Sequence, residues 1–179
     1  MTTTFTNIDA LLRRIQIMED KWQILELLAT YGPAVDSGSA DGTAEIWLEN
    51  GIYDVDSGLL SGRDDLRAMV AGEVHQNFIL NGSAHMMSLP RIEVDGDHAV
   101  AIGHSQLVLR TAGTAADFEV ARITANRWEL VKIDGRWRVE RRVGRLLDGR
   151  PDARALLGAA VTATSDTNSD GDMPDSPPE

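Results

Sequence analysis

The sequence predicts an α+β fold, in which a curved, mostly antiparallel sheet wraps over helices near the N-terminus. Residues 8–31 repeat apolar side chains at helical spacing, and a second helical segment follows within residues 61–78. From residue 84 onward the pattern changes to strands that are separated by turn signals. Helices that precede long hairpins, rather than alternating with strands, are typical of the α+β class. The length of 179 residues favours one domain.

The first long helix is expected over residues 8–31. Its apolar stripe recurs every three or four residues and consists of Ile8, Leu11, Leu12, Ile15, Met18, Trp22, Leu25, Leu28 and Tyr31. Gly32-Pro33 is expected to kink or end the helix, because proline has no N–H to donate. Asp36 then lies about one turn beyond Tyr31.

Shorter elements are expected between this helix and the strands. Residues 36–51 read as a turn followed by a short helix that contains Trp47, and residues 51–56 read as a short strand. Residues 61–78 form a single helix in this reading. Ser61 stands at its start and acidic residues occupy its first turn, as helix N-termini prefer.

Two hairpins are expected in the second half of the chain. Residues 85–94 and 98–110 are separated by Asp95-Gly96-Asp97, and residues 118–133 and 136–146 by Asp134-Gly135. Pro90 is expected at an edge or bulge, because it cannot donate to a sheet ladder. The domain is expected to span residues 1–163. Residues 164–179 are polar, acidic and proline-rich, and therefore predict a disordered tail.

Composition narrows the functional classes. The net charge of −11 argues against nucleic acid as a partner, because phosphate binding needs a basic surface. No apolar run approaches bilayer length, and the N-terminus lacks the pattern of a secretory signal, so we expect a cytoplasmic protein that does not enter membranes. The absence of cysteine excludes a thiol nucleophile and cysteine metal sites.

Asp36 and His85 are the main candidates for chemistry. Each has a plain structural reading: Asp36 as a turn acid, and His85 as a hydrogen-bonded or exposed histidine at the start of a strand. If the two meet in a pocket, the carboxylate would hold one imidazole nitrogen and leave the other free. That pair is a minimal general base.

Other polar residues lie on the predicted strands. His104 and Ser105 are adjacent and point to opposite faces, so at most one of them lines a pocket. One face of a later strand carries Arg122, Thr124, Asn126 and Trp128, and this face meets either solvent or a polar pocket. His75 and His98 are expected at the surface. No metal-ligand spacing and no nucleotide-binding motif occurs, so neither a metal nor a cofactor is expected.

Four segments together resemble a known family. They are "ILELLATYGPAVDSGSADGTAEIWLENGIYDVD", "SGRDDLRAMV", "AHMMSLPRIEVDGDHAVAIGHSQL" and "ANRWELVKIDGRWRVERR". Their order and spacing over roughly residues 10–150 resemble the SnoaL-like branch of the NTF2-like superfamily. That branch contains scytalone dehydratase, bile acid 7α-dehydratase and hexachlorocyclohexane dehydrochlorinase. The resemblance implies a cone-shaped, cystatin-like fold with a pocket at its open end.

The resemblance also implies site residues. Asp36 and His85 match the Asp–His pair of these lyases, and Tyr31 matches a tyrosine of the bile acid dehydratase pattern. Asn126 matches an asparagine of scytalone dehydratase, whose second catalytic histidine aligns with Ser105. The catalytic tyrosines of that enzyme fall on Val35 and Val55 here, so the chain is not a scytalone dehydratase.

The function expected from this resemblance is a cofactor-independent lyase. His85, oriented by Asp36, would remove a proton, and Tyr31 would hydrogen-bond the oxygen on which charge develops. A hydrophobic cyclic or aromatic substrate would contact His104 or Ser105, Arg122, Asn126 and an apolar wall that includes Trp47, Tyr53, Met69, Met86 and Leu107.

Two alternatives stay open on the same scaffold. The first is an isomerase, cyclase or hydrolase, because one base in a pocket can serve any of these reactions. The second is a non-catalytic binding or assembly domain, because fold does not determine function. In each case we expect a homo-oligomer, a trimer or a dimer, that packs through the outer faces of its sheets.

Overall fold

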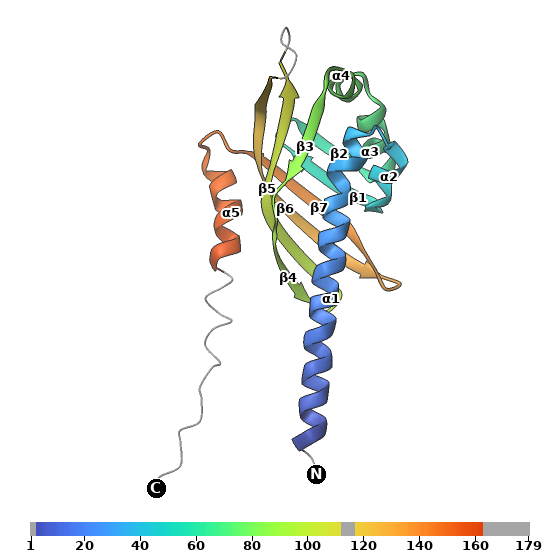
Figure 1. Ribbon diagram of the computed structural model, residues 1–179, viewed down its shortest axis with the longest axis vertical. Coiled ribbons are helices and arrows are strands. Elements are labelled where there is room, and N and C mark those ends of the chain that lie inside the picture. Colours follow the sequence, from blue (N-terminus) through green and yellow to red (C-terminus); the bar gives the residue numbers. More distant parts are fainter. Residues whose placement is uncertain (1–2, 112–116, 163–179) are drawn as a thin grey trace.

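The computed structural model describes residues 3–111 and 117–162 and has a mixed α+β architecture (Figure 1). A long helix lies against one face of an open, curved sheet, and three short helices close one end of it. In chain order the elements are α1 (Thr3–Asp36), α2 (Ala40–Glu45), β1 (Trp47–Val55), β2 (Gly58–Ser61), α3 (Gly62–Ala71), α4 (Glu73–Asn81), β3 (Ser83–Met87), β4 (Arg91–Asp95), β5 (His98–Arg110), β6 (Phe118–Ile133), β7 (Arg136–Leu146) and α5 (Pro151–Thr162).

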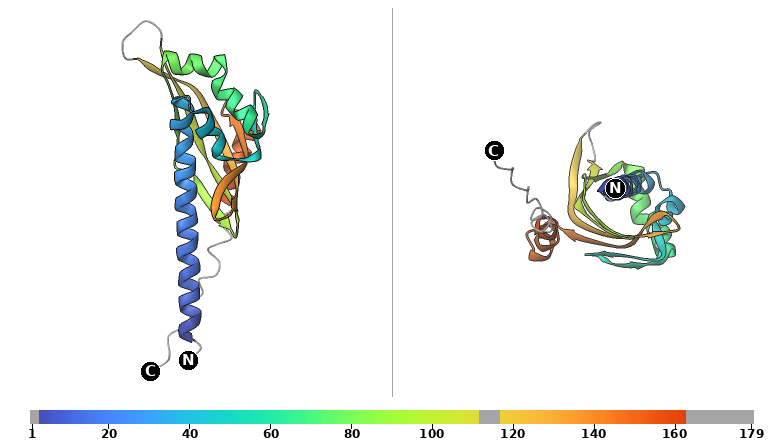
Figure 2. Two further views of the ribbon diagram at one scale, coloured as in Figure 1. Left: turned by 90° about the vertical axis from the view of Figure 1, so that its right-hand side faces the viewer. Right: turned by 90° about the horizontal axis from the view of Figure 1, so that it is seen from below.

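The sheet has seven strands in the order β2-β1-β7-β6-β5-β3, and β4 also pairs with β5. All pairings are antiparallel except that of β1 with β7. The sheet curves around α1, and α5 stands against its outer face (Figure 2). The predicted α+β class, with a curved and mostly antiparallel sheet over N-terminal helices, is therefore confirmed.

The core lies between α1 and the inner face of the sheet. Ile24, Leu28, Tyr31 and Val35 recur at three- or four-residue spacing and are all buried. They belong to one apolar cluster with strand residues such as Trp128. The helical period places these side chains on one face, which is why α1 lies along the sheet.

Asp20 is the buried polar link between α1 and the β6–β7 hairpin. Its Oδ1 accepts hydrogen bonds from Lys132 Nζ at 2.7 Å and Trp137 Nε1 at 2.9 Å. Burial alone would raise the pKa of Asp20, but the hydrogen bonds from Lys132, Trp137 and Gln16 outweigh it and lower that pKa. The charged carboxylate is therefore stabilised in the folded chain.

The first helix is longer than expected, because it continues through Pro33 and ends at Asp36. A proline inside a helix removes one ladder hydrogen bond. Ala34 and Val35 are buried, and their burial offsets that loss. Asp36 is thus the last residue of α1, and not a residue of the turn after it.

Three other expectations about the elements were wrong. Trp47 begins β1, and the short helix α2 ends before it. The helix expected over residues 61–78 is divided at Gly72 into α3 and α4. The strand expected over residues 85–94 is divided into β3 and β4, because residues 88–90, which end in Pro90, interrupt the ladder.

Helix α5 was not predicted. Its residue Ala153 is fully buried, and the helix contacts β5, β6 and β7. The expected acidic tail over residues 164–179 lies outside the described residues. Within the part of the chain that is described, no helix is both long and apolar enough to cross a bilayer.

Candidate active site

Asp36 and His85 meet at the junction of α1 and β3. Asp36 Oδ1 lies 2.7 Å from His85 Nδ1, and Asp36 Oδ2 accepts the backbone N–H of His85 at 2.7 Å. Both side chains are about four-fifths buried, with 20% of His85 and 23% of Asp36 exposed. Two bonds to one carboxylate fix both the strand and the imidazole relative to the helix end.

The close approach of α1 and β3 depends on Gly32. A Cβ built on Gly32 would lie 2.5 Å from the carbonyl oxygen of His85, closer than any side chain permits. Only glycine allows the helix to approach the strand this closely. Gly32, expected to end the helix, therefore acts as its contact point with the strand of His85.

The hydrogen bonds determine which nitrogen of His85 is free. A carboxylate only accepts, so Nδ1 carries the proton that it donates to Asp36. Within the described residues Nε2 has no protein partner, and in the neutral ring it carries a lone pair. Burial lowers the pKa of His85 below its ordinary 6.5, while Asp36 opposes that shift. The imidazole is therefore neutral at neutral pH and able to accept a proton.

His75 was expected at the surface, and this expectation was wrong. Its side chain is buried, its Nε2 donates to the carbonyl oxygen of Val35 at 3.0 Å, and its ring stacks on that of His85 with centroids 5.4 Å apart. The division of the predicted helix at Gly72 gives α4 a new direction, which brings His75 beneath the site. His98 is exposed, as expected.

A cavity of about 430 Å³ opens beside His85. It lies at the end of the sheet closed by α3 and α4, and its walls are mainly apolar. The lining includes five of the predicted residues other than His85 and Tyr31, namely Tyr53, Met69, Ser105, Leu107 and Arg122. A volume of this size accommodates a small organic molecule.

Arg142 is the group at this cavity that the sequence analysis missed. It lines the cavity and is 3% exposed, yet no carboxylate among the described residues lies within ion-pair distance of it. Its Nε and Nη2 donate to Asn126 Oδ1 at 3.0 and 2.7 Å. Its Nη1 is buried without a hydrogen-bond partner in the described residues. A buried cation with an unused donor is suited to an anionic oxygen or halide.

Three aromatic rings enclose this guanidinium. Its Cζ lies 4.5 Å from the ring centres of Tyr31 and Tyr53 and 4.2 Å from that of Trp128. Burial raises the pKa of Tyr31 well above its ordinary value, although the charge of Arg142 opposes the shift. Tyr31 therefore keeps its proton and can donate a hydrogen bond into the cavity that it lines.

Four predicted binding residues lie elsewhere. Trp47 is fully buried in the core, and Asn126 lies behind Arg142, where its Nδ2 donates to Ser105 Oγ at 2.9 Å. Neither of the two lines the cavity. Ser105, and not His104, faces the cavity, because His104 is exposed on the opposite side of β5.

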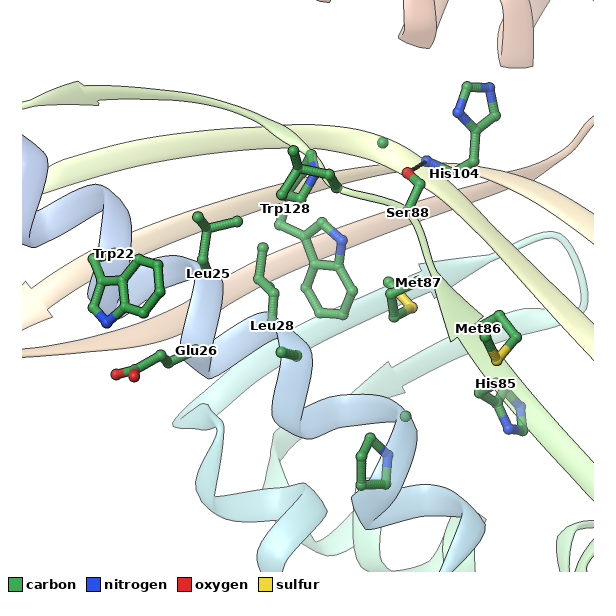
Figure 3. A pocket seen from close by; sticks show the side chains of 16 residues that line it. Trp22, Leu25, Glu26, Leu28, His85, Met86, Met87, Ser88, His104 and Trp128 are labelled. Carbon is green, nitrogen blue, oxygen red and sulfur yellow. Dashed lines mark hydrogen bonds between the residues drawn. The ribbon is translucent and has the colours of Figure 1, made fainter.

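Met86 lines a different hollow, a groove of about 530 Å³ between α1 and β3 (Figure 3). It follows His85 in a strand and points to the other face. Trp22, Leu25 and Leu28 form the helix side of this groove, and the His104 ring points away from it. The groove is mainly apolar, and His85 lines both this groove and the Asp36–His85 cavity.

A bulge in β7 explains why Arg142 was missed. Trp137 and Val139 are buried, so strict alternation would turn Arg141 inward. The β6–β7 register shifts between Glu129 and Leu130, which places one extra residue in β7. The shift reverses the alternation, so Arg142 points inward and Arg141 binds Asp54 instead. In the sequence, Arg141 and Arg142 are adjacent, and alternation alone does not tell which of the two points inward.

The comparisons with known proteins identify the family and the fold. The SnoaL-like domain family matches residues 16–143. The chain belongs to the SnoaL-like family. An NTF2-like protein with a cystatin-like fold from Novosphingobium aromaticivorans is 38% identical, with a TM-score of 0.78 over 82% of this chain and 94% of that chain. The NTF2-like, cystatin-like fold implied by the sequence is therefore confirmed.

More distant structures share the fold. Hexachlorocyclohexane dehydrochlorinase LinA-type3 from Novosphingobium barchaimii is 19% identical, with a TM-score of 0.63 over 76% of this chain and 96% of that chain. A protein from Catenulispora acidiphila, crystallised in complex with S-DNPA, is 19% identical, with a TM-score of 0.59 over 75% and 94%. No curated protein is significantly similar in sequence. The structural relatives thus include an enzyme and a protein that binds a small molecule.

The described residues do not gather the side chains that a metal site needs. Across residues 3–111 and 117–162, no three His, Asp or Glu side chains are gathered as a metal site would need. The polar groups at the cavity are instead the imidazoles of His75 and His85, the guanidiniums of Arg122 and Arg142, the Gln106 amide, hydroxyls, and the Asp36 carboxylate bound to His85. This set suits proton transfer and the binding of an anion.

Proposed function

We propose that this SnoaL-like protein is a cofactor-independent lyase, which eliminates water or another small group from a hydrophobic cyclic or aromatic molecule. One observation carries the proposal: Asp36 holds His85 Nδ1 at 2.7 Å, Nε2 has no partner among the described residues, and His85 lines a 430 Å³ cavity. A positioned base beside a cavity of this size is the minimum that proton abstraction requires.

The elimination follows from these positions. His85 Nε2 takes a proton from a substrate carbon, and the electrons of that C–H bond form the new double bond as the leaving group departs from the neighbouring carbon. Asp36 stabilises the imidazolium that results. The imidazolium then returns the proton to the departing hydroxide, which leaves as water, so the base is restored at the end of each turnover.

Arg142 and Tyr31 act on the charge that develops. Arg142 and Tyr31 both line the cavity, and Nη1 of Arg142 is a donor without a protein partner among the described residues. The positive guanidinium is opposite in charge to a forming enolate or a departing anion. Because the guanidinium is buried and unpaired, the enclosed site favours negative charge more strongly than water does. A dehydrochlorinase, which by its name removes a hydrogen and a chlorine, has the same fold, so this fold can serve an elimination.

The residues that line the cavity also indicate the class of substrate. Tyr53, Met69 and Leu107 are apolar or aromatic, so the substrate body is apolar. The reacting part carries a carbonyl, hydroxyl or halogen that reaches Arg142. We propose alicyclic or aromatic β-hydroxy ketones and chlorinated cyclohexanes as probes, because each loses a small group after removal of a carbon-bound proton.

The test compares His85→Gln and Asp36→Asn with the unmodified protein, using mass spectrometry of products from these probes. We expect the unmodified protein to release water or hydrogen chloride, and His85→Gln to lose about 10²–10⁴-fold in kcat/KM. His104→Gln is the matched control, because this histidine lies on the outer face of the same sheet and should keep full activity.

The mass of the product distinguishes a lyase from an isomerase, a cyclase or a hydrolase. A product of unchanged mass would identify an isomerase or cyclase, and a gain of water would identify a hydrolase; either would contradict the lyase proposal. Full activity of His85→Gln in a folded protein, judged by circular dichroism, would contradict the role of His85 itself.

A second variant tests Arg142. Arg142→Met should lower kcat by about 10²–10³-fold and change KM much less, because the guanidinium acts on charge that forms in the transition state. Arg141→Met is the adjacent control, since Arg141 binds Asp54 away from the cavity. Equal effects of the two variants on kcat would contradict a specific role for Arg142, and thermal unfolding would detect a general loss of structure.

A further inference from the structure

The N-terminal half of α1 carries an apolar stripe that this chain leaves uncovered. Residues 7–19 are all exposed, and the next residue, Asp20, is buried. The helix projects beyond the sheet over this part (Figures 1 and 2). Several large apolar side chains in it are between 42% and 69% exposed, namely Ile8, Leu11, Leu12, Ile15, Ile17, Met18 and Trp22. An exposed apolar patch of this kind marks an interaction surface.

The stripe follows a heptad repeat. Ile8, Ile15 and Trp22 are seven residues apart and occupy position a, while Leu11, Met18 and Leu25 occupy position d. We call these six residues the α1 seam. A spacing of alternately three and four residues is the signature of a helix that pairs with another helix. Ile at two a positions and Leu at two d positions favour two strands over three or four.

The charges beside the seam specify orientation. Arg14 and Lys21 occupy the g positions, and Glu19 and Glu26 occupy the e positions. All four are exposed, and none forms an ion pair within the described residues. In a parallel pair of identical helices, each g residue meets the e residue five positions later in the partner. Arg14 would then meet Glu19 and Lys21 would meet Glu26, whereas antiparallel pairing would bring like charges together.

The seam continues into the groove of the protein body. Trp22, Leu25 and Glu26 line the groove between α1 and β3, together with Met86 and Leu89, which are 55% and 82% exposed (Figure 3). The same helix face is therefore apolar from Ile8 to the body. The outer face of the sheet, where association was first expected, is partly covered by α5.

We propose that the α1 seam pairs with the α1 seam of a second copy of this chain in a parallel, two-stranded coiled coil. The partner helix covers the exposed apolar side chains and the adjoining groove. Two copies related by a two-fold axis along the helices place their sheets side by side. This proposal does not rest on the lyase reaction, because no seam residue lines the Asp36–His85 cavity, although His85 borders both that cavity and the groove.

Light scattering on the full chain tests the stoichiometry and the charge pairs. We expect twice the mass of one chain for the unmodified protein, and the mass of one chain for Arg14→Glu with Lys21→Glu. Arg13→Glu is the matched control, because Arg13 occupies position f, away from the seam, and should remain a dimer. Mixing the double variant with Glu19→Lys/Glu26→Lys, itself a single chain, should restore the dimer.

Cysteine cross-linking tests the orientation in a chain that has no cysteine of its own. Leu11→Cys and Trp22→Cys should each form a disulfide dimer on oxidation, because a parallel seam places each position beside its own copy. Cross-linking only in a mixture of the two variants would indicate antiparallel helices and overturn the proposal. A single-chain or trimeric mass, or a double variant that stays dimeric, would overturn it as well.

Discussion

At the scale of single residues, the site depends on a few polar atoms with fixed roles. Asp36 uses one oxygen for the backbone of β3 and the other for the ring of His85. Asn126 uses its oxygen for Arg142 and its nitrogen for Ser105 and the carbonyl of Thr124, so it has no group left for a substrate. Asn126 therefore positions a cation and does not bind substrate itself.

The pKa of His85 predicts the acid limb of activity. The neutral imidazole is the base, and burial lowers its pKa below 6.5, so kcat/KM should rise with pH through a midpoint below 6.5 and then level off. Asp36 is the partner that raises this pKa. Asp36→Asn should therefore shift the midpoint to still lower pH, in addition to reducing the rate.

The measurement is a pH profile of kcat/KM on a substrate that does not ionise in this range. His104→Gln, which changes an exposed histidine, should leave the midpoint where it is. A midpoint that moves upward in Asp36→Asn would contradict the assignment of His85 as the titrating base.

At the scale of elements, the sequence predicted periodic segments well and interruptions poorly. The strands β5, β6 and β7 match the expected segments over residues 98–110, 118–133 and 136–146, because regular alternation continues between clear turn residues. Errors occurred where a local preference was overruled by packing. Gly32-Pro33 was expected to kink or end a helix that continues to Asp36, and Gly72 divides a segment whose periodicity is continuous.

The site was predictable to the same extent. Asp36 and His85 were expected from their places after a helix and in a strand, and Tyr31 from the family resemblance. In the structure Tyr31 and His85 line one cavity, and Asp36 binds His85. Arg142 could not be placed, because the register shift in β7 is set by its pairing with β6 and leaves no mark in the local pattern. Pairing between strands, unlike alternation, is a long-range property.

The contact of α1 with β3 predicts opposite effects at two helical glycines. Alanine is favoured over glycine in helices by about 1 kcal/mol. Gly32→Ala should nevertheless destabilise the protein by about 1–3 kcal/mol, because the added Cβ meets the backbone of His85 and must displace it. Gly158→Ala in α5 meets nothing within 4 Å and should stabilise the protein by up to about 1 kcal/mol.

Urea unfolding measures the change in the free energy of unfolding for both variants. The slope of this free energy against urea concentration should be the same in the variants and the unmodified protein, as for a common two-state transition. The turnover rate is a second measurement: Gly32→Ala should reduce it, and Gly158→Ala should leave it unchanged. A Gly32→Ala protein that is as stable and as active as the unmodified one would show that α1 and β3 can separate without cost.

At the scale of the whole molecule, the chain combines a compact cone with a helix that extends beyond it. The cone contains the cavity and the core, while the extension contributes exposed apolar surface and no core. An isolated helix of this length is only marginally stable in water. The proposed second copy would therefore add to the stability of this extension.

Thermal stability should accordingly depend on protein concentration. Dimerisation stabilises the folded state by mass action, so Tm should rise as the unmodified protein is concentrated. Ile15→Asp places a charge at the centre of the α1 seam and should give a lower Tm that no longer changes with concentration. Arg13→Glu should behave as the unmodified protein does. A Tm independent of concentration in all three proteins would contradict a dimer in this range.

One consequence concerns the length of α1. At about 1.5 Å per residue, its 34 residues form an unbroken rigid lever roughly 50 Å long. Ile15 lies toward one end of this lever and the carboxylate of Asp36 at the other. A tilt of α1 at the proposed coiled coil would move Asp36 and, through it, the His85 ring that accepts the proton. Dimer assembly could thereby change the rate of the reaction.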